Sequence, residues 1–500
     1  MDERANHFPG ADELPEQMRV RREKRAQLLE RGVAPYPRGF HRTHTLAELR
    51  AEFEGLEPGT ATGQHAAVAG RVIFVRNKGK LCFARMRAGD GTELQAMLSL
   101  DRVGEGPLAD WKHLVDIGDH VGVEGEVVAS KQGELSVMAE TWTLVSKALR
   151  PLPVAHKALS EEIRVRQRYV DLIVNPAARE TVRNRAAVVR SLRSTLDERG
   201  YIEVETPVLQ LSHGGAAARP FVTHFNAFDI QMTLRIALEL HLKRSIVGGV
   251  DRVYEIGRVF RNEGSDSTHS PEFTMLELYE AYSDYDGMAE LCRGLVLNAA
   301  RVIGRTVVPD GRGGEIDLEE TWDRVTLHRA VSTAIGETVT IDTDADHLRK
   351  IAAEHDVELA PEWEHGEIVL ELFEKLAEHT LLRPTFVCDY PAAVRPLARP
   401  HRDDRRLTEA WDLVIGGVEL GVAYSELVDP VIQRERLMEQ SLRAAQGDPE
   451  AMDLDEDFLR ALEYGMPPTG GMGIGVDRLL MMLMGVGIRE TILYPLVKPE

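Results

Sequence analysis

The sequence is poor in cysteine and lacks the common short motifs of zinc and nucleotide sites. Its three cysteines, Cys82, Cys292 and Cys388, lie far apart with no C-x-x-C spacing, which argues against a disulfide framework or a zinc ribbon and predicts reduced thiols. There is no G-x-x-x-x-G-K-[ST] loop and no H-E-x-x-H helix. If the chain uses ATP, it therefore binds the nucleotide with another architecture.

Long apolar runs are also missing. No stretch reaches the ~18 apolar residues that a transmembrane helix needs. The first ten residues are polar and acidic, unlike a signal peptide. Hydrophobic residues nevertheless make up 43% of the 500 residues, enough for the cores of several domains. We therefore expect a cytoplasmic protein with no membrane segment.

Basic residues are outnumbered by acidic ones: 60 Lys and Arg against 81 Asp and Glu give a net charge of −21 at pH 7. This balance argues against indiscriminate nucleic-acid binding but leaves room for a local basic site. A predicted helix over 15–31 is such a place, because its residues 16–31 include six basic and three acidic residues. This helix could approach a phosphate backbone or form a solvated surface, and both interpretations remain open.

Residues 66–145 alternate short apolar runs with turn signals. The predicted strands are 66–75, 81–87, 93–98, 121–128 and 135–145. Five strands in about 80 residues favour an OB-type β-barrel. Such barrels bind single-stranded nucleic acid by stacking bases on aromatic residues beside polar groups, which makes Phe83, Gln95 and Arg76 the candidates. Five-stranded barrels also serve as plain interaction modules, so this pattern alone is not specific.

The segment 253–285 combines a predicted β-hairpin with an unusual set of charges. Strand 253–260 is followed by Arg-Asn-Glu-Gly, a polar loop, and a second strand on which Phe273, Glu277 and Tyr279 share one face. Arg261 and Glu263 lie beside that face. Buried charges are costly unless they are paired or bound to a ligand. The hairpin is therefore either a structural ion-pair network or the floor of a ligand site, and we favour the ligand site.

Three further segments have features of a ligand site. The glycine-alanine run 213–221 would let backbone approach a ligand closely, or would be a plain flexible loop. In 410–430, Asp412 and Glu419 flank a Gly-Gly bend and could converge on a cation. In 465–484, a glycine-rich strand leads into a helix that begins near Arg478, and helix N-termini attract phosphate.

These segments, taken in order, resemble the class II aminoacyl-tRNA synthetases, and the run FRNEG…HSPEFTMLELY resembles the lysyl enzymes. Segments 178–207, 253–285 and 465–484 resemble motifs 1, 2 and 3 of that class, and the resemblance extends over roughly residues 20–498. It implies an α+β fold in which a five-stranded OB-type barrel precedes a catalytic domain with a central antiparallel sheet flanked by helices. The implied parts are a helical extension (1–60), an anticodon-binding OB domain (61–148), a linker (149–177) and a catalytic domain (178–500) with a helical insertion (287–400).

The resemblance also implies roles in ATP binding. Arg261 would bridge the amino-acid carboxylate and the α-phosphate, while Arg478 and His269 would hold the β- and γ-phosphates. Phe273 would stack on adenine, and Glu263 would contact its amino group. The implied metal ligands are Asp412 and Glu419, which would hold Mg²⁺ on ATP.

Lysine would be recognised by its charge, because an ε-ammonium has three donors and needs acceptors. Glu277 and Glu426 would accept them, with Tyr279 hydrogen bonding and Tyr424 against the aliphatic stem. The full implied set for lysine is Gly215, Glu239, Arg261, Glu277, Tyr279, Tyr424 and Glu426. The implied anticodon contacts are Arg76, Phe83, Gln95 and, with the least specific match, Glu134. The implied partners are ATP, L-lysine, tRNA(Lys) and a second copy of the chain in a homodimer.

The sequence departs from the lysyl pattern at a few positions. Leu238 stands where proline is usual, Thr268 where arginine is common, and Val422 where asparagine is usual; Asp412 replaces a glutamate. Our hypothesis is a divergent or second-copy enzyme, weaker for ATP or lysine. Two alternatives to a translational ligase stay open: a paralogue that supplies lysyl-tRNA to an acceptor such as a lipid, and a non-catalytic RNA-binding paralogue.

Overall fold

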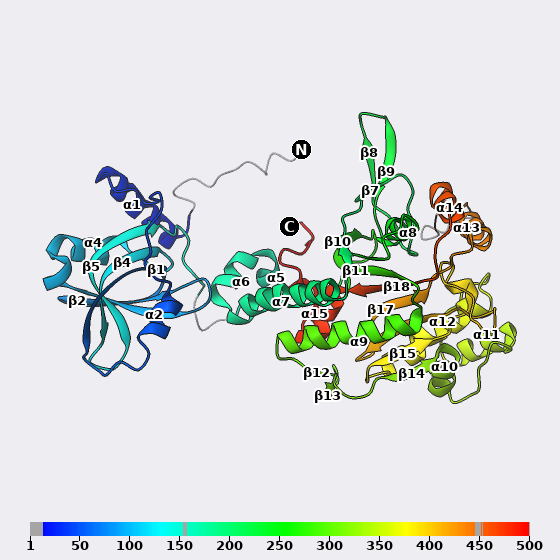
Figure 1. Cartoon of the computed structure of the whole chain (residues 1–500). Helices are drawn as coiled ribbons and strands as arrows, with labels where there is room; N and C mark the ends of the chain where they lie inside the picture. Colours follow the sequence, from blue (N-terminus) through cyan, green and yellow to red (C-terminus); the bar gives the residue numbers. More distant parts are fainter. Residues whose placement is uncertain (1–13, 154–157, 446–451, 453, 500) are drawn as a thin grey trace. The chain divides into compact units, whose positions relative to one another are not determined.

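The structure is a computed structural model that describes residues 14–153, 158–445, 452 and 454–499 (Figure 1). The polar N-terminal residues and residues 154–157 of the expected linker lie outside the described residues. The chain divides into two compact units, Met1–Arg179 and Glu180–Glu500. Among the described residues, no helix has the length and apolar character needed to cross a membrane.

The first unit is built on a closed five-stranded barrel, as expected. Its strands, in the order β1-β2-β3-β5-β4, are β1 (Ala61–Lys78), β2 (Leu81–Arg87), β3 (Glu93–Ser99), β5 (Leu135–Ser146) and β4 (His120–Ala129). Alternate side chains on β2 and β3 point inward, because successive residues of a strand face opposite sides. The inward residues are all small or apolar and form the barrel core with Trp111: Cys82, Ala84, Met86, Leu94, Ala96 and Leu98.

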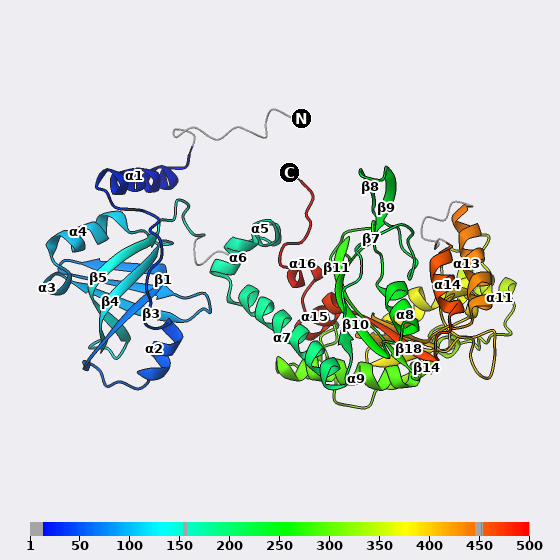
Figure 2. The ribbon, with the colours of Figure 1, turned by 45° about the horizontal axis from the view of Figure 1, so that its top comes forward.

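Helices lie around the barrel, and α1 lies beside α4 in Figure 2. They are α1 (Glu16–Glu30), α2 (Leu46–Glu52), α3 (Leu100–Val103) and α4 (Glu105–Leu114), followed in the expected linker by α5 (Glu161–Arg166) and α6 (Arg168–Val174). The predicted basic helix is therefore present as α1. Two of its basic residues are structural: Arg21 donates to two backbone carbonyls, and Lys24 pairs with Asp116 at 2.7 Å.

The second unit is organised by an eight-stranded sheet of order β14-β15-β16-β17-β18-β11-β10-β6. Its strands are β14 (Asp323–Thr326), β15 (Thr385–Cys388), β16 (Ala410–Ile415), β17 (Val418–Ser425), β18 (Thr469–Gly475), β11 (Glu272–Ala281), β10 (Arg252–Phe260) and β6 (Ile202–Glu203). Only β6–β10 and β14–β15 pair in parallel. The predicted strand over 201–207 is shortened to β6, because Thr206 instead donates from its N–H and hydroxyl to Glu255.

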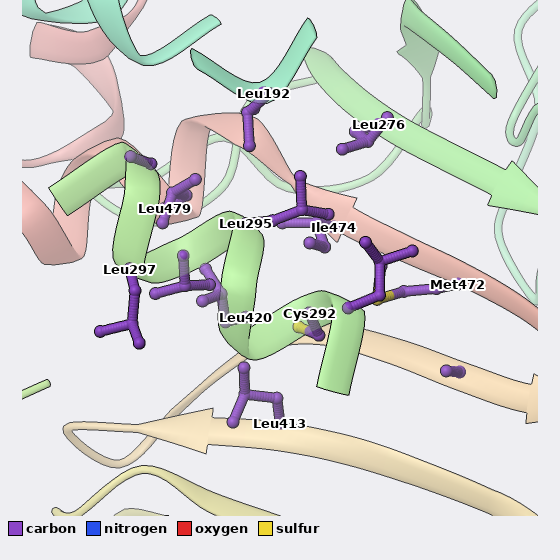
Figure 3. Close-up of a cluster of buried hydrophobic side chains, with 14 of the residues drawn as sticks. Leu192, Leu276, Cys292, Leu295, Leu297, Leu413, Leu420, Met472, Ile474 and Leu479 are labelled. Atoms are coloured by element: carbon purple, nitrogen blue, oxygen red, sulfur yellow. The ribbon is translucent and has the colours of Figure 1, made fainter. Parts of the chain in front are cut away.

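Three helices cover one face of this sheet: α7 (Pro176–Glu198), α9 (Tyr285–Val302) and α15 (Val476–Met484). Figure 3 shows Leu192, Leu295 and Leu479 from these helices meeting Met472 and Ile474 of β18. Gly471 and Gly473, which alternate with these residues along β18, lie on the opposite side of the sheet. The sheet therefore has one face packed as core and one face open for a site.

The region 287–400, expected to be a helical insertion, also contributes strands. Strands β14 and β15 belong to the edge of the main sheet, and β12 (Val307–Pro309) pairs with β13 (Glu315–Asp317). The helices are α10 (Leu327–Ile335), α11 (Ala345–Glu354), α12 (His365–Leu372), the π-helical turn η3 (Phe373–Ala377) and the 3₁₀ turns η4 (Glu378–Thr380) and η5 (Ala392–Val394). They enclose a separate apolar cluster against β15 and β16.

The remaining elements lie around the open face and at the C-terminal end. They are a small sheet of β7 (Leu209–Gln210), β9 (Ile230–Leu234) and β8 (Val222–Phe225), and the helices α8 (Glu239–Val247), α13 (Pro430–Ala445), α14 (Glu456–Glu463) and α16 (Ile488–Thr491). Helix α8 is shorter than the predicted helix over 234–250, and it begins immediately after Leu238.

Candidate active site

A cavity of about 360 Å³ opens on the uncovered face of the large sheet. Its walls come from the glycine-alanine loop, the β10–β11 hairpin, β17, β18 and the start of α15. The predicted ligand residues of this unit that line it are Gly215, Glu239, Arg261, Glu263, His269, Phe273, Glu277, Tyr279, Glu419, Tyr424, Glu426 and Arg478. One predicted residue, Asp412, is not among the lining residues.

The sheet register explains why these side chains meet. Glu277 on β11 pairs with Gly473 on β18, and Gly473 pairs with Val422 on β17, so the three form one row across neighbouring strands. The next row contains Tyr279, Gly471 and Tyr424. A side chain at Gly471 would overlap with the Glu426 carboxylate and the Tyr279 ring. The glycines of β18 are therefore required to leave room for the acidic end of the cavity.

That end holds three buried glutamates and one buried lysine. Lys243, which is fully buried, lies 2.6 Å from Glu239 Oε1 and 2.5 Å from Glu426 Oε2, and Glu277 lies close by. Burial lowers the pKa of Lys243, but the two carboxylates outweigh it and leave that pKa raised. Lys243 is therefore a fixed cation that offsets one of the three acidic charges. Sequence reasoning missed it, although its position four residues after Glu239 on a predicted helix was a signal for an ion pair.

Burial raises the pKa of two acids of this group, Glu426 and Glu277. Burial, reinforced by Glu239, raises the pKa of Glu277 to about 7. The Leu238 N–H opposes this shift, because it donates to Glu277 Oε1 at 2.9 Å. A proline at position 238 has no N–H, so this departure from the lysyl pattern adds a buried hydrogen bond to the site.

The opposite end of the cavity is positively charged. Arg261 lies over the ring of Phe273, with 5.2 Å between the guanidinium carbon and the ring centroid, and Arg478 donates to the Glu419 carbonyl at 2.9 Å. Burial lowers the pKa of Arg261, and the nearby acids Glu263, Glu277 and Glu419 oppose that effect. Both arginines line the cavity, where their guanidinium groups can bind an anion, although Arg478 also forms an ion pair with Glu419.

His269 and Glu263 lie on the loop that joins β10 to β11. His269 Nδ1 is 3.0 Å from Asp266 Oδ2, and the Thr268 N–H and hydroxyl also bond to Asp266. Glu263 accepts a bond from the Arg219 N–H at 3.3 Å. Thr268 thus stabilises the turn that presents His269 and adds no positive charge.

A buried network fixes the position of Arg478. The preceding residue, Asp477, accepts bonds from Arg185 Nη1 at 2.5 Å, the Thr274 N–H at 2.7 Å and the Thr491 hydroxyl at 3.1 Å. Asp477, which also lines the cavity, therefore joins α7, β11, α15 and α16. Sequence reasoning missed this network because its members are distant in the chain and no local pattern links them.

The two expected metal ligands have different surroundings. Glu419 lines the cavity, with Oε1 3.3 Å from Arg478 Nη1, and its carboxylate fits a role as an oxygen ligand. Asp412 does not line it, and its Oδ2 pairs with Arg395 at 2.5 Å. Within the described residues, no group of three or more His, Cys, Asp or Glu side chains could hold a metal ion.

The barrel presents a second candidate site on the outer face of β1, β2 and β3. Arg76 pairs in register with Phe83 and lies 5.8 Å from its ring centroid, and Gln95 donates to Ser136 at 2.9 Å. The structure adds Phe74 and Arg85, which pair with each other beside them. Phe74 lies two residues before Arg76, and Arg85 two residues after Phe83, so the sequence could have placed them on the same face of their strands. Glu134 adjoins this strip, since its carbonyl accepts from the Ser136 hydroxyl at 2.9 Å, and its carboxylate forms an ion pair with Arg50 at 2.9 Å.

Comparison with known proteins identifies the class. Residues 160–498 match the family described as tRNA synthetases class II (D, K and N), and residues 66–145 match the OB-fold nucleic acid binding domain. The chain therefore belongs to the class II aminoacyl-tRNA synthetases.

Within that class, the chain belongs to the lysine–tRNA ligase family. It is 56% identical over 490 residues to a lysine–tRNA ligase of Mycolicibacterium gilvum. The aligned region covers 97% of this chain and 98% of that relative. A lysine–tRNA ligase of Kineococcus radiotolerans is 56% identical over 491 residues, with 98% of each chain covered. A lysylphosphatidylglycerol biosynthesis bifunctional protein of Mycobacterium marinum is 49% identical over 493 residues, which are 97% of this chain but 44% of that longer protein. These matches confirm the expected α+β fold class and the resemblance.

The raised pKa of Glu277 predicts a pH-dependent stability. Between its ordinary pKa of 4.5 and about 7, the folded protein holds a proton that the unfolded chain releases, so this group destabilises the fold as pH rises. Glu277→Gln removes that penalty. Relative to wild type, its free energy of unfolding should increase by up to about 3 kcal/mol between pH 5 and pH 8. Urea unfolding across this range measures it, with the exposed Glu272→Gln on the same strand as control. Parallel curves for Glu277→Gln and wild type would contradict the assignment.

Proposed function

We propose that this protein is a lysine–tRNA ligase, which activates L-lysine with ATP to lysyl-adenylate and transfers the lysyl group to tRNA(Lys). The observation that carries the proposal is the charge balance of the cavity. When all three buried glutamates are ionised, as the arrival of a cationic ligand favours, they and Lys243 leave two negative charges at the acidic end. Lysine brings two ammonium groups to that end, and its carboxylate would face Arg261.

The first step would join two anions, so the site must neutralise charge. A lysine carboxylate oxygen attacks the α-phosphorus of ATP, an O–P bond forms, and the bond to the departing pyrophosphate breaks. The nucleophile is already ionised, so no general base is needed, and catalysis rests on positioning and electrostatic stabilisation. Arg261 would hold the carboxylate against the α-phosphate, and Phe273 would stack on adenine, with Glu263 contacting its amino group.

Arg478 and His269 would hold the β- and γ-phosphates, because they face the cavity from the start of α15 and the β10–β11 loop. Mg²⁺ would enter with ATP, with Glu419 as its carboxylate, and would supply additional positive charge on the phosphates. In the second step, a ribose hydroxyl at the tRNA 3′ end attacks the carbonyl carbon of the adenylate and AMP leaves. We assign no residue of this chain as base for that step.

The remaining partners follow from the same proposal. The outer strip of the barrel would bind the anticodon through Phe83, Gln95 and Arg76, and the translational substrate supports a cytoplasmic location. Exposed apolar side chains near β6 to β9 support a homodimer that would cover them. They are Ile202, Val208, Leu209, Leu211, Val222 and Phe228.

Lysine-dependent exchange of pyrophosphate into ATP, without tRNA, tests the activation step. With the twenty amino acids tested in turn, exchange should occur with lysine and with no other. Exchange with a different amino acid would overturn the substrate assignment. Absence of exchange with any amino acid, together with tRNA binding in a gel shift, would favour the non-catalytic RNA-binding alternative.

Glu426→Gln should weaken lysine activation strongly. It removes one of the acids paired with Lys243 and leaves the cavity one negative charge short of the two lysine ammonium groups. The loss in kcat/KM for lysine should correspond to about 2–5 kcal/mol, the usual cost of breaking a buried charged pair. Exchange kinetics at varied lysine measure it, with Glu272→Gln as the matched surface control. A kcat/KM within about twofold of wild type would remove Glu426 from the lysine site.

Phe83→Ala should affect tRNA charging and leave activation intact. Loss of one stacked base costs about 1–3 kcal/mol, so the KM for tRNA in aminoacylation should rise by roughly tenfold or more. Pyrophosphate exchange, which needs no tRNA, should match wild type. The control is Phe53→Ala, a substitution of a partly buried aromatic outside the outer strip. An unchanged KM for tRNA in Phe83→Ala would count against this face as the anticodon site.

A further inference from the structure

Arg395 occupies a position in the active-site cavity that the sequence did not indicate. It follows the short turn η5, lines the cavity, and places Nη2 2.5 Å from Asp412 Oδ2. Its guanidinium carbon lies 4.2 Å from the ring centroid of Tyr390. The side chains of Arg395 and Asp412 are only 18% and 6% exposed, so the pair is packed in place and is not a surface contact.

The pair changes what Asp412 can bind. Asp412 lies in β16, in register with Val422 of β17, and Val422 lines the cavity whereas Asp412 does not. One Asp412 oxygen is taken by Arg395, and the other is shut off from solvent beside the buried Tyr390 hydroxyl, which also interacts with the carboxylate. Mg²⁺ demands near-ideal octahedral geometry and usually keeps several waters. An enclosed oxygen behind a guanidinium offers neither the space nor the charge for that, so Asp412 does not fit as a magnesium ligand.

The surrounding charges explain why a cation is needed there. Besides Asp412, the acids near Arg395 are Glu374 on η3 and Glu419 on β17, and Glu378 on η4 lies close to both of those acids. The other nearby cation, Arg478, already contacts Glu419. Without Arg395, the Glu419 carboxylate that lines the cavity and the acids behind it would together repel an incoming triphosphate.

We propose that Arg395 takes the place of a divalent ion at Asp412: it supplies the positive charge on this side of ATP, and metal binding in the site depends on Glu419 and not on Asp412. The inference rests on the proposed function, because ATP is the anion it concerns. It makes Arg395 a binding residue for the triphosphate, held in position by Asp412 and the ring of Tyr390.

Metal binding can be counted directly, without turnover. Electron paramagnetic resonance of Mn²⁺ bound to the full-length protein, with lysine and a non-hydrolysable ATP analogue, gives the number of ions per active site. Asp412→Asn should bind as many ions as wild type, and Glu419→Gln should bind fewer. Arg395→Met frees the Asp412 carboxylate and should bind an additional ion, which should be lost again in Arg395→Met/Asp412→Asn. Loss of an ion in Asp412→Asn with the fold intact would overturn the proposal.

Pyrophosphate exchange at varied free Mg²⁺ gives a second readout. The Mg²⁺ concentration for half-maximal rate should rise about tenfold in Glu419→Gln and stay within about twofold of wild type in Asp412→Asn. The control is Asp286→Asn, which breaks an exposed pair with Arg324 of the same 2.5 Å length. A thermal melt of each variant identifies loss of fold. If Asp412→Asn does not fold, the double variant, which removes both charges of the pair, replaces it in the Mn²⁺ count. Equal increases in Asp412→Asn and Glu419→Gln would reject the idea. Wild-type protein without lysine-dependent exchange would instead refute the proposed function, and the Mn²⁺ count would still report on Arg395.

Discussion

The site depends on a charge that the protein itself buries. Lys243 has no access to solvent and lies between two carboxylates, an arrangement that is stable only while all three groups keep their partners. Burial raises the pKa of Glu277 and Glu426 even with Lys243 charged, and a neutral Lys243 would drive these acids further towards protonation. Once the acids are ionised, Lys243 offsets only one of them, and the remaining deficit of positive charge selects the ligand.

The sheet makes this arrangement possible. Rows of paired residues run across β17, β18 and β11, and the middle position of each row on the open side is a glycine. The same strand sends Met472 and Ile474 into the core behind. One strand therefore performs two tasks by alternation: it anchors the sheet to α9 and α15, and it clears the space in which the side chains of its neighbours meet. The buried Asp477 network then fixes α15 to that sheet, so Arg478 faces the acidic end across a constant distance.

The parts of this protein that could be predicted from sequence were those encoded locally. The barrel was predicted from short apolar runs that alternate with turn signals. The β10–β11 hairpin was predicted from two strand-like runs on either side of a polar loop. Lys243 had a weak local signal, four residues from Glu239. Arg395 had none, since it lies in a turn without periodicity and its partner belongs to another strand. The hydrogen bond from Leu238 to Glu277 depends on a backbone group, which side-chain patterns do not report. Strands β14 and β15, at one end of the large sheet, were missed because each has four residues and lies among helices.

The need for two ammonium groups in the cavity discriminates against some competitors of lysine better than against others. An amino acid whose side-chain nitrogen is acylated brings one ammonium group instead of two, and it would leave a buried carboxylate without a partner. A shorter diamine such as ornithine satisfies the same count. For ornithine, only the depth of the pocket discriminates, and one methylene is worth about 1–3 kcal/mol. That depth is set by Gly471, where a side chain would overlap with Glu426 and Tyr279. Fidelity against neutral analogues is thus electrostatic, whereas fidelity against shorter homologues rests on a glycine.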